Sequence, residues 1–253
     1  MIEEPRSWRL ERNGSTAFVA VCAEFACISL DAAAAPNPYR HPAWQLVLCT
    51  DDPVSVTDGR AAITTAPGVL IPPGLERAIR YPAGFLSLWV DPYLVAVGGT
   101  PRVHALDRDQ VRRVVTATGR DLDPERLGAA LDRLAVAAAA PDPRLRRVLR
   151  LLDEGSSVDD AAVRVGLSPR RLRQLSAAAL GGSLTALRRW HRLREAVLQF
   201  PLRPAAEIAA STGFADQAHL VRSTVAMGGV TPGRMAAVLG GAPGRASGVG
   251  GRK

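Results

Sequence analysis

The chain has 253 residues, of which 47% are hydrophobic and 22% charged, and its formal net charge is +8. This composition is typical of a globular protein with room for one large domain or two ordinary ones, and it argues against disorder. No apolar run approaches the ~20 residues that a membrane span needs, and the N-terminus lacks a cationic start followed by an apolar block. We therefore expect a cytoplasmic protein with no membrane partner.

Short apolar runs separated by turn residues fill roughly residues 17–97. They include AFVAVCAEF, WQLVLCT, GVLIPPG and FLSLWV. Asp58 and Gly59 form a dipeptide typical of hairpins, and residues 69–71 read as a strand that ends in a turn at Pro72, Pro73 and Gly74. The pattern predicts an all-β domain of barrel or sandwich type over residues 1–100.

The period of the apolar residues changes after Pro101. Residues 107–117 and 124–139 carry apolar side chains three and four positions apart, which predicts two amphipathic helices. Asp123 followed by Pro124 is a typical start for the second helix. We expect residues 101–142 to be a helical segment for dimerisation, or a linker, packed on the β domain or on a second copy of itself.

From residue 143 onward the pattern is almost entirely helical, and the charge changes sign. Residues 1–142 hold 14 Arg against 17 Asp and Glu, whereas residues 143–240 hold 15 Arg against 7 acidic residues. A basic second half is typical of a chain in which one half meets a polyanion. The glycine-rich basic tail over residues 241–253 is expected to be disordered.

A weak repeat links residues 158–175 to residues 205–223. Each copy has small apolar residues, a glycine (Gly166 or Gly213), a bulky apolar residue, and an N-cap that opens a new helix (Ser168 or Asp216). One long amphipathic helix is predicted between the copies, over residues 183–199. Two helices joined by a glycine turn form a helix-turn-helix unit, and two such units could enter successive major grooves.

The second helix of each unit must bury one face and offer the other to DNA. Arginine can chelate guanine and glutamine can chelate adenine, which makes the outer residues candidates for base contact. In the first recognition helix these are Arg170, Arg171, Arg173 and Gln174, and in the second Gln217, Ala218, Val221 and Arg222. The candidate phosphate contacts are Ser168, Arg189, Arg192 and His219. Arg189 and Arg192 could instead form salt bridges with Glu195 or other acids, and His219 could pack within its own helix.

Residues 144–239 resemble the DNA-binding domain of the AraC/XylS family of bacterial transcription regulators. The matching pieces are VGLSPRRLRQL, LRRWHRLREAVLQF, AAEIAASTGFADQAHLVRS and GGVTPGRM, in the order of the family. The resemblance implies that Asp216 caps the second recognition helix and that the turn from Gly229 to Pro232 starts the closing helix. It also implies a cupin-like N-terminal domain for effector binding and dimerisation, and recruitment or obstruction of RNA polymerase.

Two positions depart from the family pattern, because Ser176 and Thr224 stand where aromatic residues are usual. Each change removes apolar burial worth ~3 kcal/mol if nothing compensates. Trp190, Phe200 and Met227 are candidates to fill the space. The departures also motivate an alternative, an anti-regulator that pairs with another family member and blocks it.

A metal-dependent cupin enzyme is the other alternative. Such a site needs about three histidines and a carboxylate, and the β domain offers only His41, so we expect no metal, no cofactor and no catalytic residue. The domain could still bind a small effector. Large side chains on or beside strands could line its pocket, namely Arg40, His41, Trp44, Gln45, Arg77 and Trp89. Alternatively, the two tryptophans are core residues and the two arginines lie on the surface.

The sequence therefore predicts an α+β multidomain protein. A cupin-like β-barrel is followed by helices, and an all-α domain over residues 143–240 carries two helix-turn-helix units joined by a long linker helix. The predicted function is a non-enzymatic, sequence-specific transcription regulator that acts on double-stranded DNA. Its expected partners are a second copy of itself and, less directly indicated by the sequence, a small effector and RNA polymerase.

Overall fold

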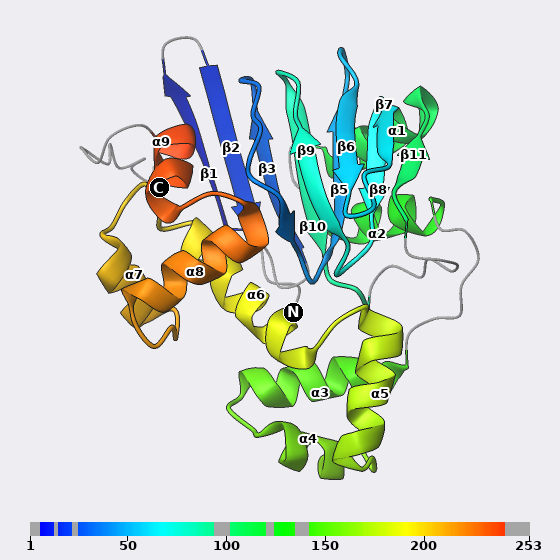
Figure 1. Cartoon of the computed structure of the whole chain (residues 1–253), viewed down its shortest axis with the longest axis vertical. Coiled ribbons are helices and arrows are strands. Elements are labelled where there is room, and N and C mark those ends of the chain that lie inside the picture. The colour runs from blue at the N-terminus through cyan, green and yellow to red at the C-terminus, as the bar shows by residue number, and fades with distance from the viewer. Residues whose placement is uncertain are drawn as a thin grey trace, which may run out of the picture.

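The computed structural model describes residues 6–12, 15–21, 25–93, 102–119, 124–134 and 142–240. The predicted tail over residues 241–253 and the predicted cap at Asp123 lie outside these residues. A strand-rich first half is followed by helices, as expected (Figure 1). The strands are β1 (Arg6–Arg12), β2 (Ser15–Val21), β3 (Phe25–Leu30), β4 (Tyr39–Arg40), β5 (Trp44–Cys49), β6 (Val54–Asp58), β7 (Ile63–Ala66), β8 (Gly68–Ile71), β9 (Glu76–Arg80), β10 (Phe85–Val90) and β11 (His104–Leu106).

The strands form two antiparallel sheets, and the closed barrel predicted for this domain is not found. The larger sheet has the order β1-β2-β3-β10-β5-β8-β11 and the smaller one the order β4-β9-β6-β7. Within the described part of the chain, no hydrogen-bonded strand pair joins the two sheets, so the domain is a sandwich. Seven strands face only four, and the wide edge at β1 and β2 lies against a C-terminal helix instead of another strand.

Strand β5 shows how the sandwich is held together, because all six of its side chains are buried. Alternate residues of a strand point to opposite faces of the sheet. Val47 and Cys49 face the smaller sheet and pack in a cluster with Val54 and Ile79. Leu46 and Leu48 face the other way and pack under the first two helices. A strand that is covered on both faces has no polar alternation, which explains its continuous apolar sequence.

Helices α1 (Arg108–Thr118) and α2 (Pro124–Asp132) cover the outer face of the larger sheet. Asp107 caps α1 with a capping box that also uses Gln110. Helix α2 ends at Asp132, within the span of 124–139 that was predicted to be helical, and residues 135–139 are not among the described ones. Strand β11 pairs with β8, so the sheet takes in residues beyond the boundary expected at residue 100.

Seven helices follow in the described C-terminal region. They are α3 (Pro143–Asp153), α4 (Val158–Arg164), α5 (Pro169–Leu180), α6 (Leu184–Val197), α7 (Ala205–Ser211), α8 (Gln217–Gly228) and α9 (Pro232–Gly240). The long amphipathic helix expected over residues 183–199 is α6, and its apolar face is buried as predicted. In Figure 1, α3, α4 and α5 form a block below the sheets, whereas α8 and α9 lie beside β1, β2 and β3.

The two regions share one buried cluster, which runs from Val47 and Ile79 inside the sandwich to Leu172 and Leu220 in the helical region. The helical region therefore packs against the β domain over an apolar seam. No helix in the described ranges is both long and apolar enough to span a bilayer.

Candidate nucleic-acid interface

Helices α4 and α5 are joined by a tight turn at Gly166, whose φ is +70°. That value lies in the left-handed region, where a β-carbon costs energy. The Oγ of Ser168 then accepts a hydrogen bond from the backbone N–H of Arg171 at 3.2 Å, so Ser168 is the N-cap of α5 as the sequence predicts. A local pattern of glycine and capping serine therefore sets the direction in which α5 leaves the turn.

One face of α5 is buried and the other is basic. Leu172 and Leu180 are buried in the core, together with the small side chain of Ser176. The four candidate base-contacting residues of this helix, Arg170, Arg171, Arg173 and Gln174, are all exposed. Arg173 makes only a long ion pair, 3.5 Å from an oxygen of the exposed Asp159. A pair this exposed is weak and leaves the guanidinium accessible to a polyanion.

Helices α7 and α8 repeat this arrangement. Gly213 has a φ of +74°, and the carboxylate of Asp216 accepts a hydrogen bond from the backbone N–H of His219 at 2.6 Å, which makes Asp216 the N-cap of α8. The ring of Phe214 is buried and meets the half-buried ring of His219 edge-on at 5.3 Å. His219 thus packs against its own turn, as its alternative assignment foresaw.

The outer face of α8 is less polar than that of α5. Gln217, Ala218 and Arg222 are exposed, Val221 is half-buried, and Leu220 is fully buried on the opposite side. Val225, which was not among the residues predicted from the sequence to contact DNA, is 37% exposed. Its position four residues after Val221 and three after Arg222 was the signal that could have identified it.

Helix α6 spans the distance between the two helix pairs. Arg192 is half-buried and donates from its guanidinium to the carbonyl oxygen of Gly213 at 2.8 Å, so it braces the turn before α8. Arg189 is also half-buried on this helix. Arg192, a candidate phosphate contact, therefore also has a structural role.

The two positions that depart from the family pattern are filled by hydroxyl groups bonded to their own helix. Ser176 donates to the carbonyl oxygen of Leu172 at 2.7 Å, and Thr224 donates to that of Leu220 at 2.8 Å. Both side chains are buried. Because each hydroxyl has its hydrogen bond, neither substitution leaves a buried polar atom without a partner.

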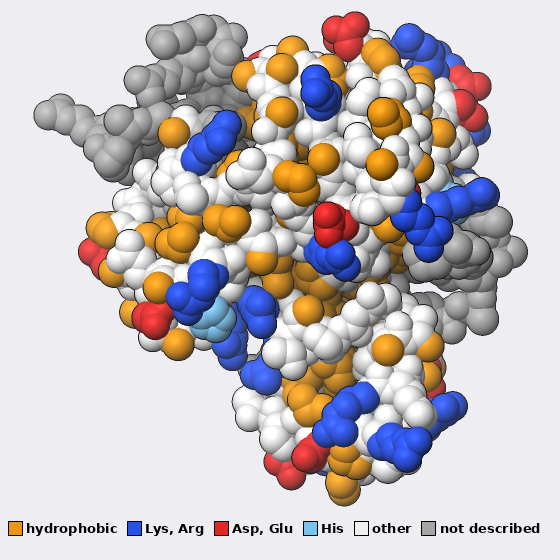
Figure 2. Space-filling model, in the orientation of Figure 1, with side chains coloured by type: hydrophobic (Ala, Val, Ile, Leu, Met, Phe, Trp, Pro, Cys, Tyr) orange, Lys and Arg blue, Asp and Glu red, His pale blue; other side chains and the backbone are white. Residues whose placement is uncertain are grey.

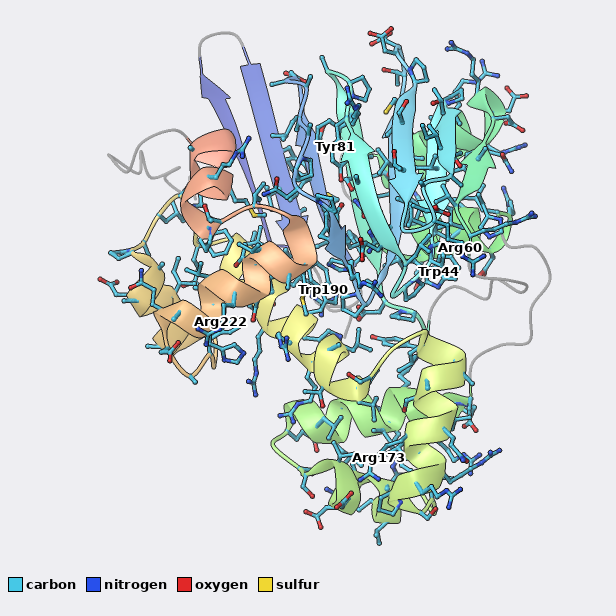
Figure 3. All side chains as sticks on the ribbon, viewed as in Figure 1. Trp44, Arg60, Tyr81, Arg173, Trp190 and Arg222 are labelled. Carbon is cyan, nitrogen blue, oxygen red and sulfur yellow. The ribbon has the colours of Figure 1, made fainter. Side chains whose placement is uncertain are left out.

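Basic side chains lie over both helix pairs on one face of the molecule. Figure 2 shows Arg side chains over the block of α3, α4 and α5 and again over α8. Figure 3 places Arg173 on the first block and Arg222 on α8. The described surface therefore offers two separate basic regions, one on each helix pair.

A buried carboxylate connects α6 to the β domain, and sequence reasoning missed it. Asp91 follows β10, and its side chain is fully buried. One oxygen accepts from the Trp190 indole N–H at 3.2 Å. The other lies 3.1 Å from the His191 ring, 3.4 Å from the Arg194 guanidinium and 2.9 Å from the Tyr93 hydroxyl, which donates to it.

The protein surroundings keep Asp91 ionised. Burial is the largest influence on its pKa and acts to raise it, but Arg194, His191 and Tyr93 together outweigh burial and hold the pKa below its ordinary value. Figure 3 shows Trp190 at the junction between the sheets and the helices. A charge that is desolvated and fully paired in this way fixes α6 against the β domain in one orientation.

The candidate effector residues do not line one common pocket. Arg40 lies on the surface and pairs with Glu76 at 2.7 Å, as its alternative assignment foresaw. Trp44 is buried on the face of the sheet that carries α1 and α2. Gln45 points to the opposite side, where its side-chain amide bonds to the hydroxyls of Tyr39, Tyr81 and Ser87. Alternation along β5 separates Trp44 from Gln45.

Arg77 is neither on the surface nor in a cavity, because its side chain is fully buried. It donates to the carbonyl oxygens of Pro72 and His41 at 3.3 Å, and burial lowers its pKa.

His41 is buried and meets Trp190 edge-on at 4.3 Å. Burial and the charge of Arg77 hold the pKa of His41 well below its ordinary value, so the ring is neutral.

Trp89, one of these candidates, borders a cavity. The cavity has a volume of about 240 Å³ and lies between the β domain and the C-terminal helices. The β domain contributes Leu30, Tyr39, Tyr81, Phe85 and Trp89, among others, and the helical region contributes Gly228, Val230, Arg234 and Met235. Its walls are apolar and aromatic, and Arg234 supplies a cation.

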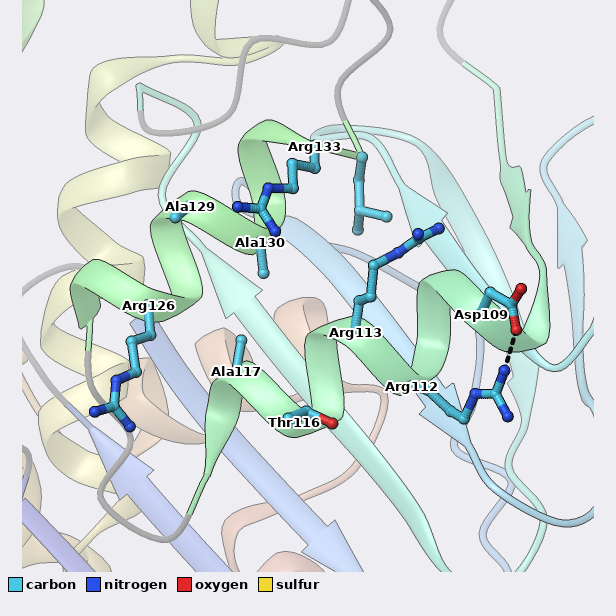
Figure 4. Close-up of a pocket in the computed structure, with 10 residues that line it drawn as sticks. Asp109, Arg112, Arg113, Thr116, Ala117, Arg126, Ala129, Ala130 and Arg133 are labelled. Carbon is cyan, nitrogen blue, oxygen red and sulfur yellow. Dashed lines mark hydrogen bonds and ion pairs between the residues drawn. The ribbon is translucent and has the colours of Figure 1, made fainter.

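A second, more open groove of about 780 Å³ lies between α1 and α2 (Figure 4). Alanines, Leu134 and Thr116 line it together with several arginines. The charged residues are Arg112, Arg113, Arg126, Arg133 and Asp109. Figure 4 shows Arg112 paired with Asp109. Across the described residues, no group of three or more His, Cys, Asp or Glu side chains could hold a metal ion.

Comparison with known proteins agrees with this geometry. The sequence profile of a family described as "Helix-turn-helix domain", which is of the AraC type, matches residues 161–237. No curated protein matches the chain in sequence.

Similar solved structures cover nearly the whole chain. ToxT from Vibrio cholerae strain SCE256 with bound unsaturated fatty acid has a TM-score of 0.59 at 11% identity and covers 93% of this chain and 100% of its own. ToxT from Vibrio cholerae O395 gives 0.57 at 9% identity, with 87% and 98% covered. Identities this low show a shared fold only. The profile match confirms the resemblance to the AraC/XylS family over residues 161–237, so the chain carries an AraC-type helix-turn-helix domain.

Proposed function

We propose that the chain is a transcription regulator that reads two successive major grooves of a specific DNA site with α5 and α8. The observation that carries the proposal is the repeated geometry of two helices. Each follows a glycine turn, each is capped by a side chain, and each exposes its outer face beside a basic surface. Major grooves recur about every 34 Å along one face of a duplex, and α6 is the element that would span this distance.

Selection of binding sites from random duplexes with the full-length protein, at two salt concentrations, tests this proposal. Phosphate attraction weakens steeply with salt, whereas base reading persists as sequence preference. We expect a motif of two blocks with centres about one helical turn apart. Enrichment of no sequence at either salt concentration, both by the protein alone and with oleate added, would rule the proposal out.

The residue assignments can be tested in the selected site. Arg170→Ala should relax the sequence preference, because Arg170 is placed at a base edge. Arg189→Ala should weaken binding at all sequences and flatten the salt dependence, because Arg189 is assigned to phosphate. Ser168, Arg192 and His219 are proposed as further phosphate contacts, although their present contacts cap α5, brace the turn before α8 and pack on that turn. Equal loss of specificity at Arg170 and Arg189 would overturn the face assignment.

The β domain is proposed to control this activity through the contact between Asp91 and α6. In Figure 1, α5 runs up the view while α8 runs across it. Two equivalent units in successive grooves on one face of a straight duplex would be related by a translation, so their recognition helices would be parallel. The docked arrangement therefore holds the helices away from that geometry, and a change at the seam would shift the population that can bind.

An effector is proposed to act at the cavity in the same seam. Its apolar walls, with Arg234 as a cation, suit a molecule with an apolar body and a carboxylate. The similar ToxT structures support this class, since one holds an unsaturated fatty acid. Oleate should raise the melting temperature of the protein, and Arg234→Ala should reduce that shift. An equal shift in both proteins would exclude this site.

Pairing of two copies and contact with RNA polymerase complete the proposal. A symmetric contact across the α1 and α2 groove would oppose arginines to arginines, which is unfavourable. We therefore place a homodimer contact elsewhere on these helices. Sedimentation of the free protein and of its DNA complex measures the number of copies, and transcription in vitro with purified polymerase measures the sign of regulation. The proposal assigns no catalytic step to the chain.

A further inference from the structure

The outer faces of α5 and α8 differ in chemistry at equivalent positions. Ser168 and Asp216 are the two N-caps, so corresponding residues lie 48 positions apart. Arg170 corresponds to Ala218, Arg173 to Val221, Gln174 to Arg222 and Ala177 to Val225. At the same four helix positions, α5 offers three polar side chains and α8 offers only one.

The apolar residues of α8 lie on the side opposite to its core contacts. With 100° between successive residues, Ala218, Val221 and Val225 fall within about 60° of one another. Leu220 and Met227, which are 0% and 5% exposed, point the other way into the core. Ala218 and Val225 are exposed and Val221 is half-buried. These three residues form a continuous outer strip, here called the apolar strip, with Arg222 along one edge.

The apolar strip has no hydrogen-bonding capacity to offer to a base edge. Among the groups that line the major groove, the thymine C5-methyl is the apolar one, and side chains such as alanine contact it directly. We propose that α8 recognises thymine methyl groups through Ala218, Val221 and Val225, and this inference rests on the proposed function. Helix α5 then reads the other block through its arginines. The two blocks of the site then differ in composition.

The other large aliphatic side chains that are exposed among the described residues lack this arrangement. Ile63 on β7 and Val163 on α4 are each 71% exposed, and Leu202 between α6 and α7 is 61% exposed. None of the three lies on a helix that follows a capped glycine turn with its outer side chains free. Around the axis of α8, the apolar strip lies between Gln217 on one side and Arg222 on the other. This flanking by polar side chains distinguishes it from single exposed aliphatic residues.

Replacement of thymine by deoxyuridine tests the inference, because it removes only the methyl group. The full-length protein is titrated against the selected duplex and against duplexes in which the thymines of one block carry uracil. Burial of one methyl is worth roughly a fourfold change in affinity. We expect a loss of about fourfold for each contacted methyl in the α8 block and no loss from the same exchange in the α5 block.

Variants identify the side chains that contact the methyl groups. The double substitution Val221→Ser with Val225→Ser should weaken binding to the thymine duplex and reduce the difference between thymine and uracil to the part that Ala218 contributes. Ala177→Ser, at the α5 position equivalent to Val225, is the matched control and should leave that difference unchanged. Thermal unfolding of the variants confirms that they are folded.

The outcomes separate the inference from the proposed function. A selected two-block site whose affinity does not respond to uracil in either block would overturn the inference and leave the proposed function standing. A response of undiminished size in the double variant would also overturn it. Failure to select any site would remove both.

Discussion

The two halves of the helical region are attached to the β domain in different ways. The second half is held by hydrogen bonds. The buried carboxylate of Asp91 accepts from Trp190 and Arg194 of α6, and the backbone N–H of the exposed Asn37 donates to the carbonyl oxygen of Gly229 at 3.1 Å. The contacts of the first half include the close approach of Gly181 to the backbone of Pro73 and a stacking contact in which Arg146 lies 5.6 Å from the ring centre of Tyr93.

This difference indicates where a signal from the β domain would enter. Buried polar contacts have one good geometry, whereas close backbone approach and exposed stacking tolerate small shifts. A change in the β domain should therefore reach α6 and α8 first, and α5 through α6. The predictions below test that order, beginning with the largest effect.

Loss of the Asp91 carboxylate should have the largest effect. Asp91→Ala removes the buried carboxylate that accepts from Trp190, Tyr93 and Arg194, which costs about 3–5 kcal/mol of unfolding free energy. Asp159→Ala is the matched control in the first half, since Asp159 pairs with Arg173 at the exposed surface and its loss should cost at most ~1 kcal/mol. Denaturant unfolding measures the loss of unfolding free energy in both variants. Equal losses would contradict the difference between the two halves.

Alanine substitutions at three glycines with left-handed backbone conformation should lower the unfolding free energy by different amounts. At Gly229 a β-carbon would overlap the carbonyl oxygen of Asn37, at Gly181 it would lie 3.1 Å from that of Pro73, and at Gly166 it would meet nothing within 4 Å. Gly166→Ala should cost about 1–2 kcal/mol for its backbone conformation alone. Gly229→Ala should cost about 1–3 kcal/mol more, and Gly181→Ala an intermediate amount. Denaturant unfolding measures these losses. A larger loss for Gly181→Ala than for Gly229→Ala would contradict the stronger attachment of the second half.

Stability should fall in mildly acidic solution because of His41. Its folded-state pKa lies well below the ordinary value near 6.5, so below that pH the unfolded chain takes up a proton that the folded chain does not. Unfolding free energy should decrease by about 1.4 kcal/mol per pH unit well below pH 6.5. His41→Gln should remove most of this slope between pH 6.5 and 5. Asp91, whose pKa is lowered, affects stability only at still lower pH, below about 4.

The smallest effects are expected at the two hydroxyls that replace aromatic residues. Ser176→Ala and Thr224→Val each remove one hydrogen bond to a helix carbonyl and leave no donor unsatisfied, so each should change the unfolding free energy by about 1 kcal/mol or less. These positions occur one in each half, which makes them a matched pair. A loss of ~3 kcal/mol at either residue in thermal or denaturant unfolding would show that it carries more of the core than its bonds indicate.

The parts of the fold that the sequence predicted are local. A glycine with positive φ followed by a capping side chain is decided within a few residues, and the caps at Ser168 and Asp216 are where the pattern placed them. The hairpin after Asp58 and the strand that ends before Pro72 are equally local. The buried face of α6 follows from helical periodicity alone.

The parts that were missed depend on distant contacts. Asp91 meets α6 residues about 100 positions later, and nothing near it in the sequence distinguishes it from any residue that follows a strand. A barrel was predicted because short alternating strands do not reveal whether sheet edges meet. The pocket assignment was incorrect at Trp44 because adjacent residues of a strand point to opposite faces, so nearness in sequence did not mean nearness in space.

The continuous apolar cluster that crosses the seam also affects how the chain can be divided. A fragment cut near residue 143 would carry Trp190 and Arg194 into water without Asp91, and the sandwich would lose the cover over Trp89 and His41. Such pieces would expose surfaces that favour aggregation. We therefore expect that the two regions do not fold independently, and that heating unfolds both of them in a single cooperative step.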